Sequence, residues 1–121
     1  KMDGESLFDI ILKNTDPNLV IIQLDTGNLY NGGANAMDVV KKYPGRFASL
    51  HVKDEIPATS GNEKYESCIL GAGIVNVKDV IDVVRKTTKG VHYIIEQESY
   101  QGKASLDCVK EDLAIMKKWG Y

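Results

Sequence analysis

The chain has 121 residues, of which 43% are hydrophobic and 26% are charged, and its net charge at pH 7 is −2. This composition is typical of a soluble globular domain, so we expect one domain over residues 1–121. No basic stripe points to nucleic acid, and no apolar run approaches the roughly 18 residues that a membrane span requires. We therefore expect neither nucleic acid nor a membrane as a partner. The start at Lys1 carries no targeting segment and does not read as a natural N-terminus, and the expected location is cytoplasmic.

Helical and strand patterns alternate along the chain. Apolar residues at helical spacing predict four helices, over residues 5–14, 35–43, 77–89 and 105–119. Near-continuous apolar runs predict three buried strands, over residues 19–25, 47–53 and 91–96. Residues 26–33 and 54–70 are expected to be loops, the second of a length that is usually functional or mobile. The two cysteines, Cys68 and Cys108, are expected to be buried thiols rather than a disulfide.

The order α-β-α-β-α-β-α predicts an α/β fold with parallel strands joined by right-handed crossovers. Three strands leave two unpaired edges and much exposed apolar helix surface. Two architectures remain open on this ground, a small open α/β domain and a part of a larger barrel. We favour the part of a barrel, which self-association or a further half-barrel would complete.

Three apolar strands each end in a side chain that can bind a metal ion, namely Asp25, His51 and Glu96. The carboxyl ends of parallel strands meet at one edge of a sheet, so these side chains are expected to lie together. Two carboxylates and an imidazole suit Mn²⁺, Mg²⁺, Co²⁺ or Zn²⁺. The alternative is that each residue ends its strand by chance and is solvated or hydrogen-bonded. Because all three consecutive strands end in such a residue, we favour a metal site.

The same strand ends belong to a longer set of motifs. These are Leu24-Asp25, the run RFASLHVKD over residues 46–54, the run LGAGIVN over residues 70–76, and Ile95-Glu96-Gln97-Glu98. In order and spacing they resemble the sugar phosphate isomerase/epimerase family, the xylose isomerase-like TIM barrels. The resemblance covers essentially the whole chain and implies the C-terminal half of a (β/α)8 TIM barrel, strands six to eight. Because a complete barrel needs about 250 residues, the first half is expected to be missing.

The resemblance also implies a metal site and a proton shuttle. Family members hold a divalent metal, expected here to be Mn²⁺, with a Glu, an Asp, a His and a Glu on the last four strands. Asp25, His51 and Glu96 match the last three of these ligands. The metal polarises sugar oxygens and stabilises an enediolate, while two carboxylates exchange the proton. Glu96 is therefore expected to be both a metal ligand and the catalytic acid/base.

Three further residues, Asn28, Lys53 and Glu98, are expected to bind substrate. Asn28 stands where many family members carry a His, and its amide can bond a hydroxyl but is a poor metal ligand. Lys53 is expected to pair with an anionic or enolate oxygen, the alternative being a solvated lysine at a strand end. Glu98 is expected to bond substrate hydroxyls, the alternative being a surface role. Asp54 is expected to be structural.

The resulting hypothesis is a metal-dependent isomerase or epimerase that acts on a small sugar or polyol and is inactive as this fragment alone. Pro57 stands where epimerase branches often carry an Arg, so their substrate contacts do not transfer. One alternative is a dehydratase of polyols or sugar acids on the same metal site. Others are a non-catalytic assembly module and an abasic-site endonuclease, the latter disfavoured by the acidic charge and Asn28. Unpaired strand edges predict a homo-oligomer.

Overall fold

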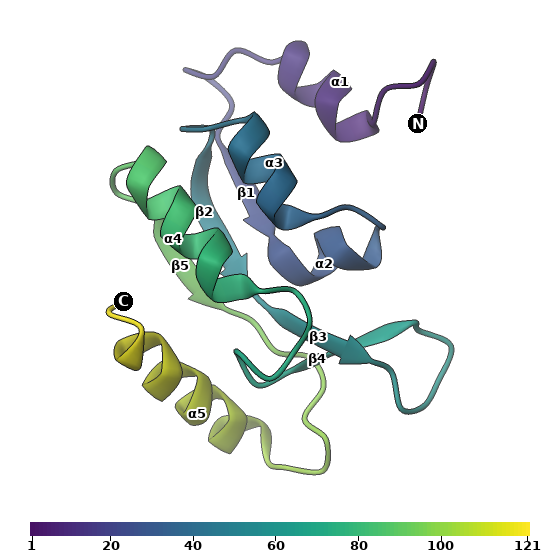
Figure 1. The fold of residues 1–121 in the computed structure, drawn as a ribbon, viewed down its shortest axis with the longest axis vertical. Coiled ribbons are helices and arrows are strands. Elements are labelled where there is room, and N and C mark those ends of the chain that lie inside the picture. The colour runs from purple at the N-terminus through teal and green to yellow at the C-terminus, as the bar shows by residue number, and fades with distance from the viewer.

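The computed structural model describes residues 1–121 and contains a parallel three-stranded sheet at its centre (Figure 1). Its strands, in spatial order, are β1 (Ile22–Asp25), β2 (Phe47–Val52) and β5 (His92–Ile95). Both neighbouring pairs are parallel, and Asp25 lies directly opposite His51. All three strands therefore end at the same edge, as the sequence predicts.

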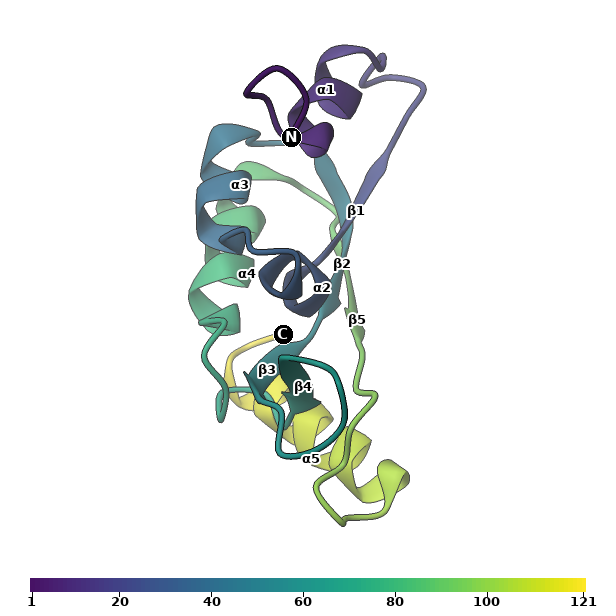
Figure 2. The same cartoon turned by 90° about the vertical axis from the view of Figure 1, so that its right-hand side faces the viewer.

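Helices cover one face of this sheet. The predicted helices are present as α1 (Leu7–Lys13), α3 (Ala36–Lys42), α4 (Val77–Thr87) and α5 (Ser105–Lys118). Figure 2 shows α3 and α4 side by side against one face, whereas no helix covers the other. The buried core between α4 and β2 includes Leu50, Val52, Val80, Ile81 and Val84. None of the five helices combines the length and the apolar character that a membrane crossing requires.

The first predicted strand and the segment after it differ from the expectation. β1 begins only at Ile22, and Leu19 and Ile21 are 82% and 77% exposed, so the first half of the apolar run is not buried. The expected loop at residues 26–33 begins with a short helix, α2 (Thr26–Asn31). This helix forms because the Asp25 carboxylate accepts a hydrogen bond from the backbone N–H of Asn28 and caps its first turn.

The prediction of a loop over residues 54–70 is also wrong, and this difference affects the functional site. It holds an antiparallel hairpin of β3 (Asp54–Pro57) and β4 (Tyr65–Cys68). Asp54, Glu55, Glu66 and Ser67 interrupt any apolar run in these strands, so they lack the signal of a buried strand. Pro57 is tolerated because it ends its strand opposite Tyr65. Cys68 and Cys108 are both buried free thiols, as predicted, and burial raises the pKa of the Cys68 thiol to about 12.

Asp54 joins this hairpin to the turn before α4. Its side chain is 1% exposed, and its carboxylate accepts hydrogen bonds from the backbone N–H groups of Gly71, Gly73 and Val75 at 2.9–3.1 Å. A methyl group on Gly73 would lie 2.2 Å from Asp54 Oδ1, so the turn needs glycine there. The structural role predicted for Asp54 is therefore confirmed.

Asp54→Asn is expected to lower the free energy of unfolding by about 3 kcal/mol, because an amide NH₂ would face backbone donors that lose their buried acceptor. Urea-induced unfolding monitored by circular dichroism measures the change. Glu63→Gln is the matched control, since it also removes one carboxylate but at an exposed position. Equal stability of the two variants would contradict this role for Asp54.

Candidate metal centre

The side chains of Asp25, His51 and Glu96 meet beyond the ends of the three strands. One potential ligand atom from each of the three side chains lies within 4.8 Å of the other two. His51 Nδ1 lies 3.6 Å from Asp25 Oδ2 and contacts Glu96 Oε2. Glu96 is held at this position because its backbone N–H donates to the carbonyl of Val52 at the end of β2. The structure thus brings together the three ligands predicted from the sequence.

Lys53 lies at the centre of the acidic groups. Its side chain is 1% exposed, which rules out the alternative of a solvated lysine. Nζ lies 2.9 Å from Glu96 Oε1, 2.5 Å from Glu98 Oε2 and 3.6 Å from Asp25 Oδ2. Burial of the ammonium opposes its charge, but the hydrogen bonds to Glu96 and Glu98 outweigh burial and raise the pKa of Lys53 above its ordinary value.

The same contacts keep Glu96 in its ionised form. The hydrogen bond from Lys53 is the main reason that the pKa of Glu96 lies below its usual range, while partial burial acts in the opposite direction. His51 adds to the lowering. A carboxylate that is ionised near neutral pH can both ligate a cation and accept a proton.

Asn28 and Glu98, both predicted to bind substrate, contact this cluster. The Asn28 amide donates to Asp25 Oδ2 at 2.8 Å, and its Oδ1 accepts from Lys53 at 3.1 Å. Asn28 therefore orients Asp25 and Lys53 in this arrangement. The side chain of Glu98 is 68% exposed apart from its bond to Lys53, so it can also reach a ligand.

The donor set fits a divalent cation. Carboxylate oxygens and an imidazole nitrogen are the ligands that Mn²⁺ and related ions take in proteins. Three carboxylates, those of Asp25, Glu96 and Glu98, surround the single ammonium of Lys53. The cluster therefore carries an excess of negative charge that a bound cation would balance. Asp25, His51 and Glu96 would hold such an ion.

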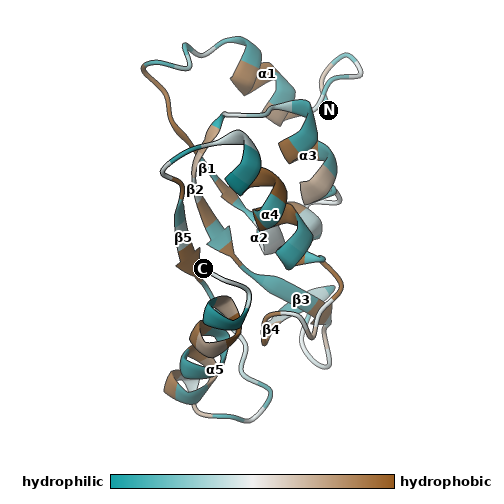
Figure 3. Ribbon diagram, turned by 60° about the vertical axis from the view of Figure 1, so that its left-hand side comes forward, coloured by the Kyte–Doolittle hydropathy of each residue, from teal (hydrophilic) through white to brown (hydrophobic).

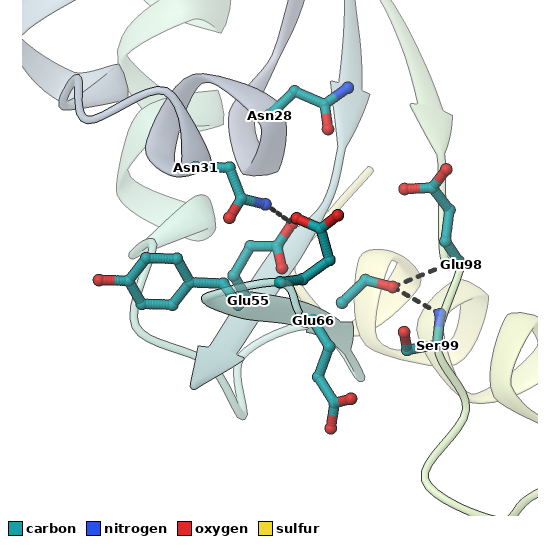
Figure 4. A pocket seen from close by; sticks show the side chains of 9 residues that line it. Asn28, Asn31, Glu55, Glu66, Glu98 and Ser99 are labelled. Carbon is teal, nitrogen blue, oxygen red and sulfur yellow. Dashed lines mark hydrogen bonds between the residues drawn. The ribbon is translucent and has the colours of Figure 1, made fainter. Parts of the chain in front are cut away.

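A polar pocket of about 440 Å³ adjoins the cluster (Figure 4). It is lined by Asn28, Asn31, Glu55, Glu63, Tyr65, Glu66, Ser67, Glu98 and Ser99. Except for Asn28 and Glu98, these residues are absent from the predicted site. Most of them belong to the β3–β4 hairpin, where the apolar pattern predicts a loop. The signal that could have found them is the carboxylate of Glu55 two positions after Lys53, continuing the alternation from His51.

Close packing under α2 fixes the boundary between the cluster and the pocket. A methyl group on Gly27 would lie 2.4 Å from Glu55 Oε1 and 2.6 Å from Lys53 Cδ. Only a residue without a side chain leaves room there for both. The hydroxyl of Thr26 adds a second anchor, since it donates to the carbonyl of Lys53 at 2.7 Å and accepts from the backbone N–H of Lys53 at 3.0 Å.

Comparison with known proteins gives partial sequence matches. The chain is 41% identical over 59 residues to an inosose dehydratase of Clostridium botulinum (strain Eklund 17B / Type B), a match covering 46% of this chain and 20% of that protein. It is 34% identical over 62 residues to the inosose dehydratase of Salmonella typhimurium (strain LT2), covering 51% and 19% of the two chains. The matches thus span about a fifth of these relatives. No family model matches the chain.

The fold has a solved counterpart. A sugar phosphate isomerase/epimerase from Parabacteroides distasonis ATCC 8503 matches 97% of this chain and 37% of its own, with a TM-score of 0.71 and 24% sequence identity. The chain has the fold of part of a xylose isomerase-like TIM barrel. The predicted resemblance and fold class are confirmed. In a TIM barrel the strand edge that carries Asp25, His51 and Glu96 is the edge at which active sites lie.

Gly27→Ala is expected to displace the side chains of Lys53 and Glu55 and to lower the melting temperature by several degrees, because the new methyl group overlaps both. Gly32→Ala is the matched control. Gly32 follows the same helix and has a φ of −71°, in the region that any residue can adopt. A methyl group added there would have no neighbour nearer than 3.4 Å. Differential scanning calorimetry compares the two, and equal melting temperatures would contradict the packing argument.

Proposed function

We propose that the protein is a metal-dependent enzyme that removes a proton from the carbon next to a carbonyl group in a small polyhydroxy substrate. The observation that carries this proposal is the convergence of Asp25, His51 and Glu96 around the buried ammonium of Lys53. The proposed ion is Mn²⁺, with Mg²⁺, Co²⁺ and Zn²⁺ as the other ions that suit the donor set. When bound, it would supply Lewis-acid polarisation of substrate oxygens.

Loss of water from an inosose-like substrate is the reaction we favour, because the partial sequence relatives are inosose dehydratases. Glu96 is the proposed base, since its pKa is lowered and its carboxylate contacts both His51 and Lys53. It takes the proton, the C–H electron pair forms a C=C bond, and the C–O bond to the neighbouring hydroxyl breaks. Return of the proton to the departing oxygen gives water and an unsaturated ketone.

Isomerisation or epimerisation of a sugar is the second candidate. The fold match to a sugar phosphate isomerase/epimerase favours it. The first step is the same removal of a proton by Glu96. In this case no C–O bond breaks, and the proton returns to the neighbouring carbon or to the opposite face of the same carbon. Lys53 lies where its ammonium could stabilise negative charge on a substrate oxygen in either reaction.

Self-association is a further part of the proposal. The exposed apolar residues Leu19, Ile21 and Ile94 lie in or next to the outer strands β1 and β5. Figure 3 shows the apolar end of β5 at the side of the sheet away from β1. Unpaired edges and exposed apolar residues support either a second copy of the chain or a further part of a barrel as the cover.

Asp25→Ala and His51→Ala in the full-length protein are expected to weaken Mn²⁺ binding by about 100-fold or more, because each removes a ligand. Isothermal titration calorimetry measures the affinity. His92→Ala is the control, since the second histidine is exposed and lies opposite Ser49, away from the strand ends. Unchanged affinity in both ligand variants would remove the basis of the proposed function.

With inosose as substrate, the full-length protein is expected to release water in a reaction that EDTA abolishes and added Mn²⁺ restores, because proton removal depends on the polarised carbonyl. Proton NMR in D₂O follows the reaction. A new vinylic or methylene signal identifies dehydration, since the enol first formed can become a diketone, whereas deuterium in an otherwise intact sugar identifies isomerisation or epimerisation. Neither change with inosose or a panel of ketoses would contradict the proposal.

A further inference from the structure

Glu55 is a buried carboxyl with an oxygen that has no partner in the protein. The residue is 2% exposed, and it lies among the residues that line the polar pocket (Figure 4). Asn31 donates a long hydrogen bond of 3.4 Å to Glu55 Oε1, whereas Oε2 has no hydrogen-bond partner. The reaction proposed above does not use this side chain.

Such a carboxyl is unfavourable in the ligand-free protein. A buried polar group without a partner costs free energy, and replacement of such a group by an apolar one is often neutral or stabilising. The fold nevertheless makes room for it, because Gly27 leaves the space that Glu55 Oε1 and the Lys53 side chain occupy. A polar group that the protein leaves unpaired inside a pocket indicates a ligand that pairs with it.

The pocket continues directly from the candidate metal centre. Asn28 and Glu98 line the pocket, and both also hydrogen-bond to the Lys53 ammonium within the centre. A substrate with its reacting oxygens at Asp25, His51 and Glu96 would therefore extend toward Glu55. The distal part of the substrate is the part that this side chain can contact.

We propose that Glu55 Oε2 hydrogen-bonds to a hydroxyl group of the substrate on a carbon that does not react, so that Glu55 determines which polyols the enzyme accepts. This inference rests on the proposed function for the identity of the substrate. It assigns to Glu55 a role in specificity and none in the movement of the proton.

A hydroxyl suits this position better than an anion. Four glutamates line the pocket, and the ammonium of Lys53, which adjoins it, is already bonded to Asn28, Glu96 and Glu98. A phosphate or carboxylate would meet uncompensated negative charge there. Burial raises the pKa of the Glu55 carboxyl, although Lys53 opposes the rise, and a protonated carboxyl can donate to a hydroxyl as well as accept from one.

Glu55→Met in the full-length protein tests the inference, because methionine has a similar length and no oxygen. Calorimetry on the Mn²⁺-loaded protein measures the affinity for inosose and for myo-inositol, a polyol without the carbonyl group. We expect at least tenfold weaker binding of both probes, with Mn²⁺ affinity unchanged and a melting temperature that is equal or higher. Glu55→Gln, which keeps a donor and an acceptor, is expected to bind within about threefold of the wild type.

Glu111→Met is the matched control, since Glu111 is exposed on α5 and does not line the pocket, and it is expected to leave both affinities unchanged. Wild-type affinity in the Glu55→Met variant would overturn the inference, and so would a wild-type protein that binds neither probe. Loss of Mn²⁺ affinity in Glu55→Met would make Glu55 a structural residue instead. Failure of the proposed function would give a different result. The wild-type protein would then show no turnover, while binding of the two probes would still depend on Glu55.

Discussion

The buried ammonium of Lys53 is the interaction on which the site depends. It follows β2 and joins acidic side chains from two other parts of the chain, Asp25 at the end of β1 and Glu96 and Glu98 after β5. Without it, these carboxylates would repel one another at a partly buried edge. With it, the pKa of Glu96 stays below its usual range, and the three carboxylates lie close enough together to bind a cation. One lysine thus balances part of the negative charge at this edge of the sheet.

The surrounding fold serves to hold that lysine and the strand ends in place. The parallel register sets Asp25 opposite His51, and the hydroxyl of Thr26 fixes the backbone of Lys53 from the start of α2. Asp54, the next residue, points the other way and ties the β3–β4 hairpin to the turn before α4. These adjacent residues therefore have different roles. Lys53 pairs with the carboxylates of the site, and Asp54 anchors the hairpin that forms one wall of the pocket.

Apolar periodicity was sufficient to predict the parallel strands, four of the five helices and the convergence of Asp25, His51 and Glu96, because these features follow from buried faces and strand direction. It failed where polar contacts determine the structure. The helix α2 depends on the cap that Asp25 provides, and the strands of the β3–β4 hairpin mix polar with apolar residues and hold no apolar run. The alternation from His51 through Lys53 to Glu55 could have indicated the face on which Glu55 lies, but its burial depends on the space beside Gly27, which the sequence does not reveal.

Different residues would determine the reaction and the substrate specificity. The residues around Lys53 would move the proton. Glu55, in the adjoining pocket, would determine which substrate binds. Anomalous scattering from crystals of the full-length protein grown with Mn²⁺ tests the central claim most directly, because it locates the ion and its ligands together. We expect one ion bound by Asp25, His51 and Glu96, with Lys53 still bonded to Glu98. Mn²⁺ absent from these residues, or bound only elsewhere, would contradict it.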